Sequence, residues 1–253
     1  MKSPKILEEF GYREFYDKIR HGARIKTSLL NSEELCSAFR PVLDVGEDIM
    51  YLTISSGISG TYHSATMAAE MLMNEYPERR IRCFDSLGAG LGVGIQALRA
   101  KKLSQEGLDV DEAYNILIKE RLNVCEYFIV DDLSHLRRGG RVTALQAVFG
   151  TMLSVKPILF GSDRGTIETC CKVKGRANAI NTLADKYREK RLSDTPGIVG
   201  ISHGDCIQDA NKLAELVEGI AKPREIIIVP HEPLTGSHVG PGMLALFFYG
   251  TSR

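Results

Sequence analysis

The stretch Ile49-Met-Tyr-Leu-Thr-Ile54, which leads directly into Ser55-Ser-Gly-Ile-Ser-Gly-Thr-Tyr-His-Ser64, decides how this chain of 253 residues is expected to fold. The first part is a short apolar run typical of a buried strand, and the second is a Ser/Gly/Thr loop that opens a helical pattern. Such a loop brings backbone N–H groups, hydroxyls and the positive end of a helix dipole together, which favours a bound carboxylate or phosphate. The alternative is a plain helix cap with glycines for turn geometry.

Similar apolar runs recur outside this stretch, and helical patterns lie between them. The other runs expected to be strands are Ile81–Phe84, Tyr127–Val130, Pro157–Phe160, Ile198–Ile201, Glu225–Val229 and Leu244–Tyr249. The stretches with helical spacing are Glu9–Arg20, Ser32–Leu43, Gly60–Glu75, Gly88–Gln105, Asp111–Leu122, Gly175–Arg191 and Ile207–Ala221. Because strands that alternate with helices form βαβ units, we expect an α/β fold of two α/β lobes with mainly parallel sheets.

The division between the lobes is expected near residue 155, where the uncharged run Val142–Val155 meets Lys156-Pro157. Residues 1–155 would form an amino-terminal α/β lobe and residues 156–253 a carboxy-terminal α/β lobe. Gly161-Ser-Asp-Arg-Gly165 lies between two strand-like runs and predicts a turn. One antiparallel hairpin is therefore expected in the second lobe.

The composition excludes several classes of protein. Hydrophobic residues make up 43% and charged residues 25%, which is globular and argues against a disordered chain or a coiled-coil rod. The formal net charge is zero, so no basic excess suggests a nucleic-acid partner. The six cysteines include no CxxC pair, which fits a reducing, cytoplasmic location. No transmembrane segment is expected, because the continuous apolar run Met243–Tyr249 is far short of the roughly 20 residues that span a bilayer.

Familiar catalytic motifs are missing from the Ser55–Ser64 loop. No GK[ST] follows it, so it lacks the lysine that would meet a triphosphate, and Ser56-Gly-Ile-Ser-Gly60 is not a GxSxG nucleophile elbow. A small serine-dependent hydrolase or acyltransferase that uses Ser59 and His238 remains the alternative to a binding function. No catalytic residue, cofactor or metal is assigned, because the sequence shows no metal-ligand spacing such as HxH or HExxH.

Three further segments carry polar groups in suggestive places. Asp85-Ser86 ends an expected strand, and the glycines at 88, 90, 92 and 94 are interpreted as small residues that let a helix pack closely. Arg137, Arg138 and Arg141 surround Gly139-Gly140; they would bind phosphate or dock an acidic partner, or they would complement the carboxyl end of a helix. His238 lies in an expected loop, where the flanking Gly-Pro-Gly would fix its direction.

Taken together and in order, these motifs resemble the DegV family of bacterial fatty-acid-binding proteins. The matching pieces are Thr27-Ser28, Ser55–Tyr62 (SSGISGTY), Asp85-Ser86, Leu136–Arg141 (LRRGGR), Lys156–Leu159 (KPIL), Arg176 and His238–Gly242 (HVGPG). Two features depart from the family pattern. The family's usual first strand, with its Thr-Asp-Ser motif, has no counterpart here, and Leu29-Leu30 stands where the family usually has Gln-Pro.

The resemblance implies a soluble carrier that buries a long-chain fatty acid in a tunnel. Carried over residue by residue, it implies that Thr27, Ser59, Gly60 and His238 bind the carboxylate. It also implies a separate fatty-acid kinase as partner, which would make the acyl phosphate, so that the chain by itself is not an enzyme. Arg137, Arg138 and Arg141 would then dock that kinase. The run Val142–Val155 is expected to form part of the tunnel wall, with ordinary core packing as the alternative.

Overall fold

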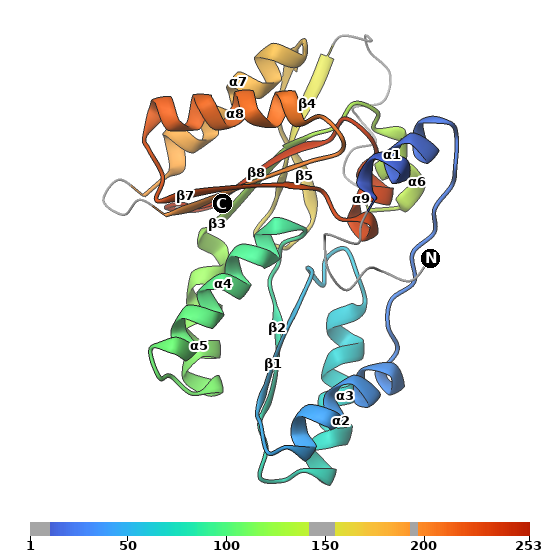
Figure 1. The fold of residues 1–253 in the computed structure, drawn as a ribbon, viewed down its shortest axis with the longest axis vertical. Coiled ribbons are helices and arrows are strands. Elements are labelled where there is room, and N and C mark those ends of the chain that lie inside the picture. The colour runs from blue at the N-terminus through green and yellow to red at the C-terminus, as the bar shows by residue number, and fades with distance from the viewer. Residues whose placement is uncertain (1–10, 142–154, 193–196) are drawn as a thin grey trace.

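The computed structural model describes residues 11–141, 155–192 and 197–253, and its strands form two sheets (Figure 1). The small sheet pairs β1 (Ile49–Thr53) in parallel with β2 (Ile81–Asp85). The large sheet has six strands in the order β5-β4-β3-β8-β6-β7. Its strands are β3 (Val124–Ile129), β4 (Val155–Gly161), β5 (Ile167–Lys174), β6 (Ile198–His203), β7 (Glu225–Pro230) and β8 (Leu244–Tyr249).

Helices cover both sheets. They are α1 (Tyr12–Arg20), α2 (Ser32–Asp44), α3 (Thr61–Glu75), α4 (Leu91–Gln105), α5 (Val110–Glu120), the 3-10 turn η2 (Arg121–Asn123), α6 (Ser134–Gly139), α7 (Arg176–Lys190), α8 (Ile207–Ile220) and α9 (Pro233–Val239). Figure 1 shows α2 and α3 on one side of the small sheet and α4 and α5 on the other. Helices α7 and α8 cover the outer face of the large sheet, and α4 reaches its inner face (Figure 1).

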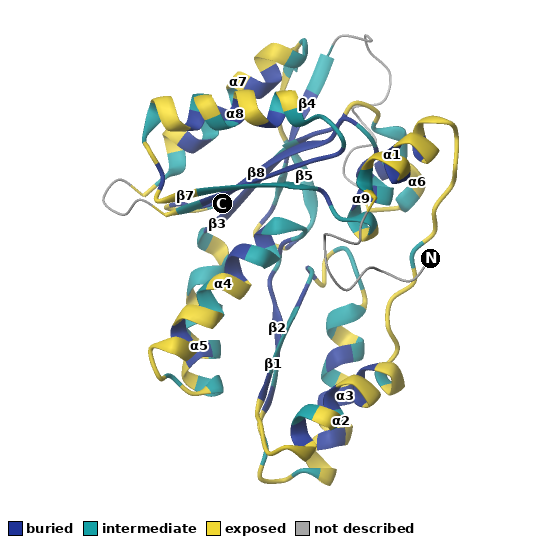
Figure 2. Cartoon of the chain, in the orientation of Figure 1, coloured by how far each residue is buried: buried dark blue, intermediate teal, exposed yellow. Residues whose placement is uncertain are grey.

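The four central strands of the large sheet, β4, β3, β8 and β6, are largely buried because both of their faces are covered, whereas the edge strands β5 and β7 are mostly half-buried (Figure 2). On the outer face, Ile129, Ile201 and Leu246 belong to a core shared with α7 and α8. On the inner face, Leu159, Ala245 and Phe247 pack with Ile95 of α4. Since the four central strands need no polar face toward water, near-continuous apolar runs were the right signal for them, whereas the edge strand β5 alternates polar and apolar residues.

The α/β class is confirmed, and each apolar run named above coincides with a strand. The hairpin expected around residues 161–165 is also present, as β4 and β5. The second strand of that hairpin, β5, had been given no bounds, because polar and apolar residues alternate in it. The helix α6, of 6 residues, had been expected only as one of two interpretations of the arginine motif, and α9, of 7 residues, had not been expected. Helices this short gain little from intrinsic propensity and depend on packing.

The pairing within the large sheet differs from the expected mainly parallel arrangement. β6 and β7 are parallel, whereas β8 runs antiparallel to both β3 and β6, and β4 is antiparallel to β3 and β5. The connection from β7 through α9 stays at the edge of the sheet where β7 ends. The first residue of β8, Leu244, therefore pairs with the last residue of β6, His203. A strand that enters at this edge must run opposite to β6.

The first strand of the large sheet in chain order is β3, which precedes the expected division between residues 155 and 156. The assignment of residues 1–155 and 156–253 to two lobes remains a prediction. The strands β3, β6 and β7 all end at one edge of the large sheet. The loops after β3 and β7 lead from that edge into α6 and α9.

Candidate ligand-binding cavity

A cavity of about 440 Å³ lies against the inner face of the large sheet. This volume is in the range of small-molecule sites, roughly 300–1,000 Å³. Much of its wall is apolar, with Phe128 and Phe247 from the large sheet and Ile54 and Leu87 from the loops after β1 and β2. The hydroxyl-rich loop, the segment before α2 and the helix α9 supply its polar groups. Such a cavity suits a ligand with a long apolar part and one polar end.

Thr27 and His238 meet at this cavity although they are 211 positions apart in the chain. A hydrogen bond of 2.8 Å joins Thr27 Oγ1 to His238 Nε2, and both side chains are half-buried. His238 was expected in a loop, but it belongs to α9, whose first turn is capped by Glu232. The Gly139 backbone lies against the other side of the imidazole, where a Cβ would come within 2.6 Å of Nδ1. The ring is therefore held in one direction by α6 and aimed at Thr27.

Ser59 and Gly60 also line the cavity, at the start of α3. The Ser59 hydroxyl is joined to Thr61 Oγ1 at 2.8 Å and accepts the Thr61 N–H at 3.2 Å. The Ser59 N–H donates to the Ser55 carbonyl, and Ser55 in turn donates to the Gly165 carbonyl of the β4–β5 turn. The four residues expected to bind the carboxylate thus line one cavity. Thr61 adds a hydroxyl that sequence reasoning missed, although it stands in the same motif.

Asp85 organises this loop and does not line the cavity. Its carboxylate accepts the Ser56 hydroxyl at 2.6 Å and the backbone N–H groups of Ser56 and Leu87 at 3.1 Å. It therefore ties the loop after β1 to the loop after β2. An acid at the carboxyl end of a strand was a candidate functional group, and here it holds the hydroxyl-bearing loop in place.

The three arginines around Gly139-Gly140 do not form one uniform patch. Arg141 lines the cavity, and its guanidinium donates to the carbonyls of Ile58 and Gly139. Arg138 donates to Ser134 and contacts His135 within its own helix, and Arg137 is likewise exposed on α6. Gly140 ends α6 in the left-handed region at φ +70°, so the helix-end reading of this motif is correct. Arg141 differs from its two neighbours in reaching the mouth of the cavity.

The protonation of His238 follows from its surroundings. Burial, and then the positive charge of Arg141, lower the pKa of its imidazole below the ordinary value. A neutral imidazole has one donor and one acceptor nitrogen. In the tautomer that carries its proton on Nε2, His238 donates to Thr27 Oγ1, and the Thr27 hydroxyl can donate its own proton to an anion. His238 is directed at Thr27 and not at Ser59. A serine hydrolase needs its base on the nucleophile, so this geometry does not support the alternative based on Ser59 and His238.

A buried acid in the cavity wall was not expected from the sequence. Glu126 of β3 is 6% exposed and lines the cavity. Its Oε2 accepts the Ala89 N–H at 3.1 Å, while its Oε1 has no hydrogen-bond partner among the described residues. Burial raises the pKa of this carboxyl to about 7, although Arg253 and the Ala89 N–H act in the opposite direction. The only signal for it was a single charge inside the apolar run Val124–Ile129.

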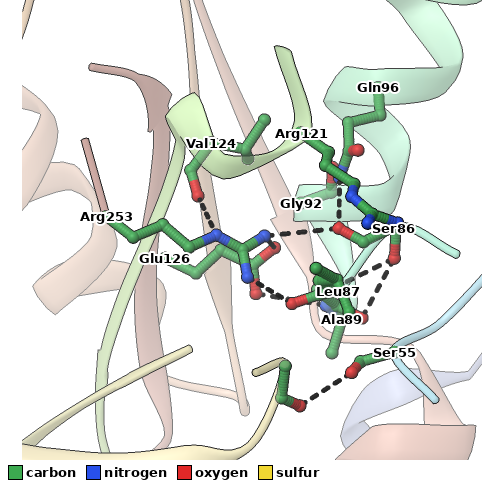
Figure 3. A network of polar contacts seen from close by, with 12 residues as sticks. Ser55, Ser86, Leu87, Ala89, Gly92, Gln96, Arg121, Val124, Glu126 and Arg253 are labelled. Atoms are coloured by element: carbon green, nitrogen blue, oxygen red, sulfur yellow. Dashed lines mark hydrogen bonds and ion pairs between the residues drawn. The ribbon is translucent and has the colours of Figure 1, made fainter. Parts of the chain in front are cut away.

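Two of the four glycines after β2, Gly88 and Gly92, are explained by this acid. Oε1 of Glu126 lies 1.9 Å from where a Cβ of Gly88 would be and 2.0 Å from that of Gly92. These glycines do allow a close approach at the start of α4, as interpreted, and the group that approaches is the carboxylate of Glu126. Figure 3 shows the surrounding network, in which Arg253 extends across Glu126. The Arg253 guanidinium donates to the carbonyls of Val124 (3.0 Å), Ser162 (3.1 Å), Ser86 (3.3 Å) and Leu87, and its Nη2 lies 3.9 Å from Glu126 Oε1.

The sequence also led to predictions about a tunnel wall, membrane spans, metal sites and cysteines. The tunnel-wall run Val142–Val155 lies outside the described residues except for Val155, the first residue of β4. Within the described residues, no helix is long and apolar enough to cross a membrane, and no group of three or more His, Cys, Asp or Glu is placed to hold a metal. The six cysteines, all of which lie in the described ranges, carry free thiols.

Comparison with known proteins agrees with this arrangement. The family model described as "Uncharacterised protein, DegV family" matches residues 7–251. A DegV domain-containing protein of Clostridium perfringens is 35% identical over 248 residues, which cover 98% of this chain and 85% of the relative. Among solved structures, DegV of Bacillus subtilis, described as a fatty acid binding protein, has a TM-score of 0.80 at 29% identity, covering 93% of this chain and 83% of that one. A Thermus thermophilus DegV family protein, described by its fatty acid binding, has a TM-score of 0.84 at 27% identity, covering 96% and 85%. The chain belongs to the DegV family.

Proposed function

We propose that this chain is a carrier that holds one long-chain fatty acid in the cavity. The observation that carries the proposal is the arrangement at the mouth: the Thr27–His238 pair and the Ser59–Gly60 loop lie at one apolar cavity. The solved relatives described as fatty-acid-binding support it. The carboxylate would accept hydrogen bonds from Thr27, Ser59 and the N–H groups of the loop at Gly60, while His238 orients Thr27.

Affinity and orientation would come from different parts of the ligand. Burial of about fifteen methylenes at about 0.8 kcal/mol each contributes roughly 12 kcal/mol before the costs of association. A carboxylate that leaves water must meet donors, because an unpaired buried charge is expensive. The nearby guanidinium of Arg141 adds attraction at the mouth. The chain would act without a cofactor and without catalysis of its own, in the cytoplasm, where free thiols such as its six persist.

Loss of either hydroxyl is expected to weaken binding. Thr27→Ala and Ser59→Ala should each lower the affinity for a fluorescent fatty acid by roughly 1–3 kcal/mol, the usual cost of an unmet buried polar group. Thr66→Ala is the matched control, because Thr66 lies on α3 with its hydroxyl on the His63 carbonyl and outside the cavity. Equal affinity in all three variants would contradict the assignment of the carboxylate site.

We also propose that a separate fatty-acid kinase is the partner and that Arg137 and Arg138 steer it to the cavity mouth. Both are exposed on α6, which lies beside α9 and His238. Exposed charges act mainly on association rates and on their salt dependence. Arg141 would contribute to docking and also to holding the carboxylate, since it lines the cavity.

The arginines can be separated by single variants. Arg138→Ala should leave fatty-acid affinity unchanged and lower acyl-phosphate formation by about tenfold at low salt in a reconstituted kinase assay, with a smaller effect at high salt. Arg141→Ala should lower both. Arg188→Ala, on the outer helix α7, is the control for loss of one exposed arginine. If Arg138→Ala leaves turnover unchanged at both salt concentrations, the docking role is wrong.

A further inference from the structure

The cavity wall is polar at a second place, away from the carboxylate site. Of the described residues that line the cavity, Glu126 is the one that carries a carboxyl group. It lies on the inner face of β3, two residues before Phe128 on the same face, and three residues before the strand ends at Ile129. At about 3.3 Å per residue, Glu126 is roughly 10 Å from the edge of the sheet beyond which α6 and α9 begin. It therefore belongs to the inner part of the wall.

The carboxyl group has little freedom to turn away. Oε1 is wedged between the backbones of Gly88 and Gly92, and Oε2 is bonded to the Ala89 N–H. The charged group beside it is Arg253, whose side chain is 1% exposed and whose donors are engaged by four carbonyls. Arg121, from η2, donates to the Asp85 carbonyl, and the buried His231 contacts Gly90 and is engaged by Ser202 and Thr235.

We propose that Glu126 limits the length of the acyl chain that the cavity accepts, an inference that rests on the proposed fatty-acid-binding function. A methyl end that advances onto this part of the wall would exclude solvent from beside a carboxyl group whose Oε1 is already buried without a hydrogen-bond partner. Replacing polar solvent beside a charge with hydrocarbon is unfavourable. The gain in affinity that each added methylene brings along the apolar wall therefore ends where the chain reaches Glu126.

The charge of Glu126 is what enforces this limit. Because the pKa of Glu126 is raised to about 7, the carboxyl is mostly neutral near pH 6 and mostly charged near pH 8. A neutral carboxyl is much less costly to cover than a carboxylate. Longer acids should therefore be accepted at the lower pH. The head-group contacts are the same for every chain length, so they cancel when acids of different length are compared at one pH.

The test is a ladder of saturated acids from about 12 to about 20 carbons, bound to the wild-type protein and to Glu126→Gln at about pH 8. Before the limit, each methylene should improve affinity roughly fourfold. The affinity of the wild-type protein should stop rising at one chain length. The affinity of Glu126→Gln should rise over about two further methylenes, which gives roughly fifteenfold tighter binding of the longest acids. Glu168→Gln, on the β5 edge strand outside the cavity, should keep the wild-type limit.

A second arm requires no variant. At about pH 6 the wild-type limit should move toward the longer limit of Glu126→Gln, and the limit of that variant should not depend on pH. The same limit in wild type and Glu126→Gln at about pH 8, or a wild-type limit that is equal at both pH values, overturns the inference while leaving the carrier function intact. Failure of the wild-type protein to bind any acid on the ladder contradicts the proposed function itself.

Discussion

Replacing Gly92 with alanine is expected to lower the free energy of unfolding by roughly 3 kcal/mol, although alanine is the better helix former. A Cβ at position 92 would lie 2.0 Å from Oε1 of Glu126 and 2.6 Å from its Cδ. The carboxyl cannot yield easily, because it is bonded to the Ala89 N–H and lies next to the fully engaged Arg253. Denaturation in urea measures the effect. Gly219→Ala in α8 is the control, since a Cβ there meets nothing within 4 Å, and it should be neutral or stabilising.

A second substitution identifies the cause. Glu126→Ala removes the group that occupies the space, so the Gly92→Ala/Glu126→Ala double variant should be more stable than the sum of the single effects predicts. The coupling should amount to at least about 1 kcal/mol, as is usual for residues in direct contact. A Gly92→Ala variant that behaves like Gly219→Ala, or single effects that simply add, would contradict the close contact between α4 and this carboxyl.

Stability should also depend on pH through Glu126. Its pKa is raised from 4.5 to about 7 in the folded chain, so the folded state holds the proton more tightly than the unfolded state does. The stabilisation is fully present below the ordinary pKa and is lost as the pH rises through about 7. The shift corresponds to a loss of up to roughly 3 kcal/mol between about pH 4 and about pH 8.

Buried histidines change the stability with pH in the opposite direction, and their contribution must be removed from the measurement. Burial lowers the pKa of His135, His203, His231 and His238, so these imidazoles destabilise the fold as the pH falls. The informative quantity is therefore the difference between the Glu126→Gln variant and wild type, measured by urea denaturation across this range. The variant should be increasingly more stable than wild type as the pH rises. If the two stability profiles run parallel at every pH, the pKa of Glu126 is not raised in the folded chain.

Local patterns predicted the parts of this fold that depend on neighbours in the sequence. The Ser55–Ser64 loop, the strand before it and the helix after it were readable because strand period, turn residues and helix spacing act over a few positions. The pairing of β8 between β3 and β6 was not readable, since it depends on where α9 delivers the chain. The helix α9 itself was taken for a loop because its 7 residues include Pro, Gly, Ser and Thr.

The same contrast holds at the site. Thr27, Ser59 and His238 were found through motifs whose meaning came from a resemblance, and the structure places them at one cavity. Glu126 carried no motif, and the glycines that accommodate it are 34 to 38 positions away. Nothing in a single sequence pairs a lone acid in an apolar run with a glycine-rich helix start elsewhere. Contacts of this kind become visible only when the two sheets are in place.

The central claim is that this chain carries a fatty acid, and native mass spectrometry of the protein purified from cells tests it most directly. The account predicts a mass above that of the 253-residue chain by one long-chain fatty acid, an adduct that is reduced in Thr27→Ala and Ser59→Ala and retained in Thr66→Ala. A wild-type protein that carries no such adduct and gains none when fatty acids are added would contradict the account.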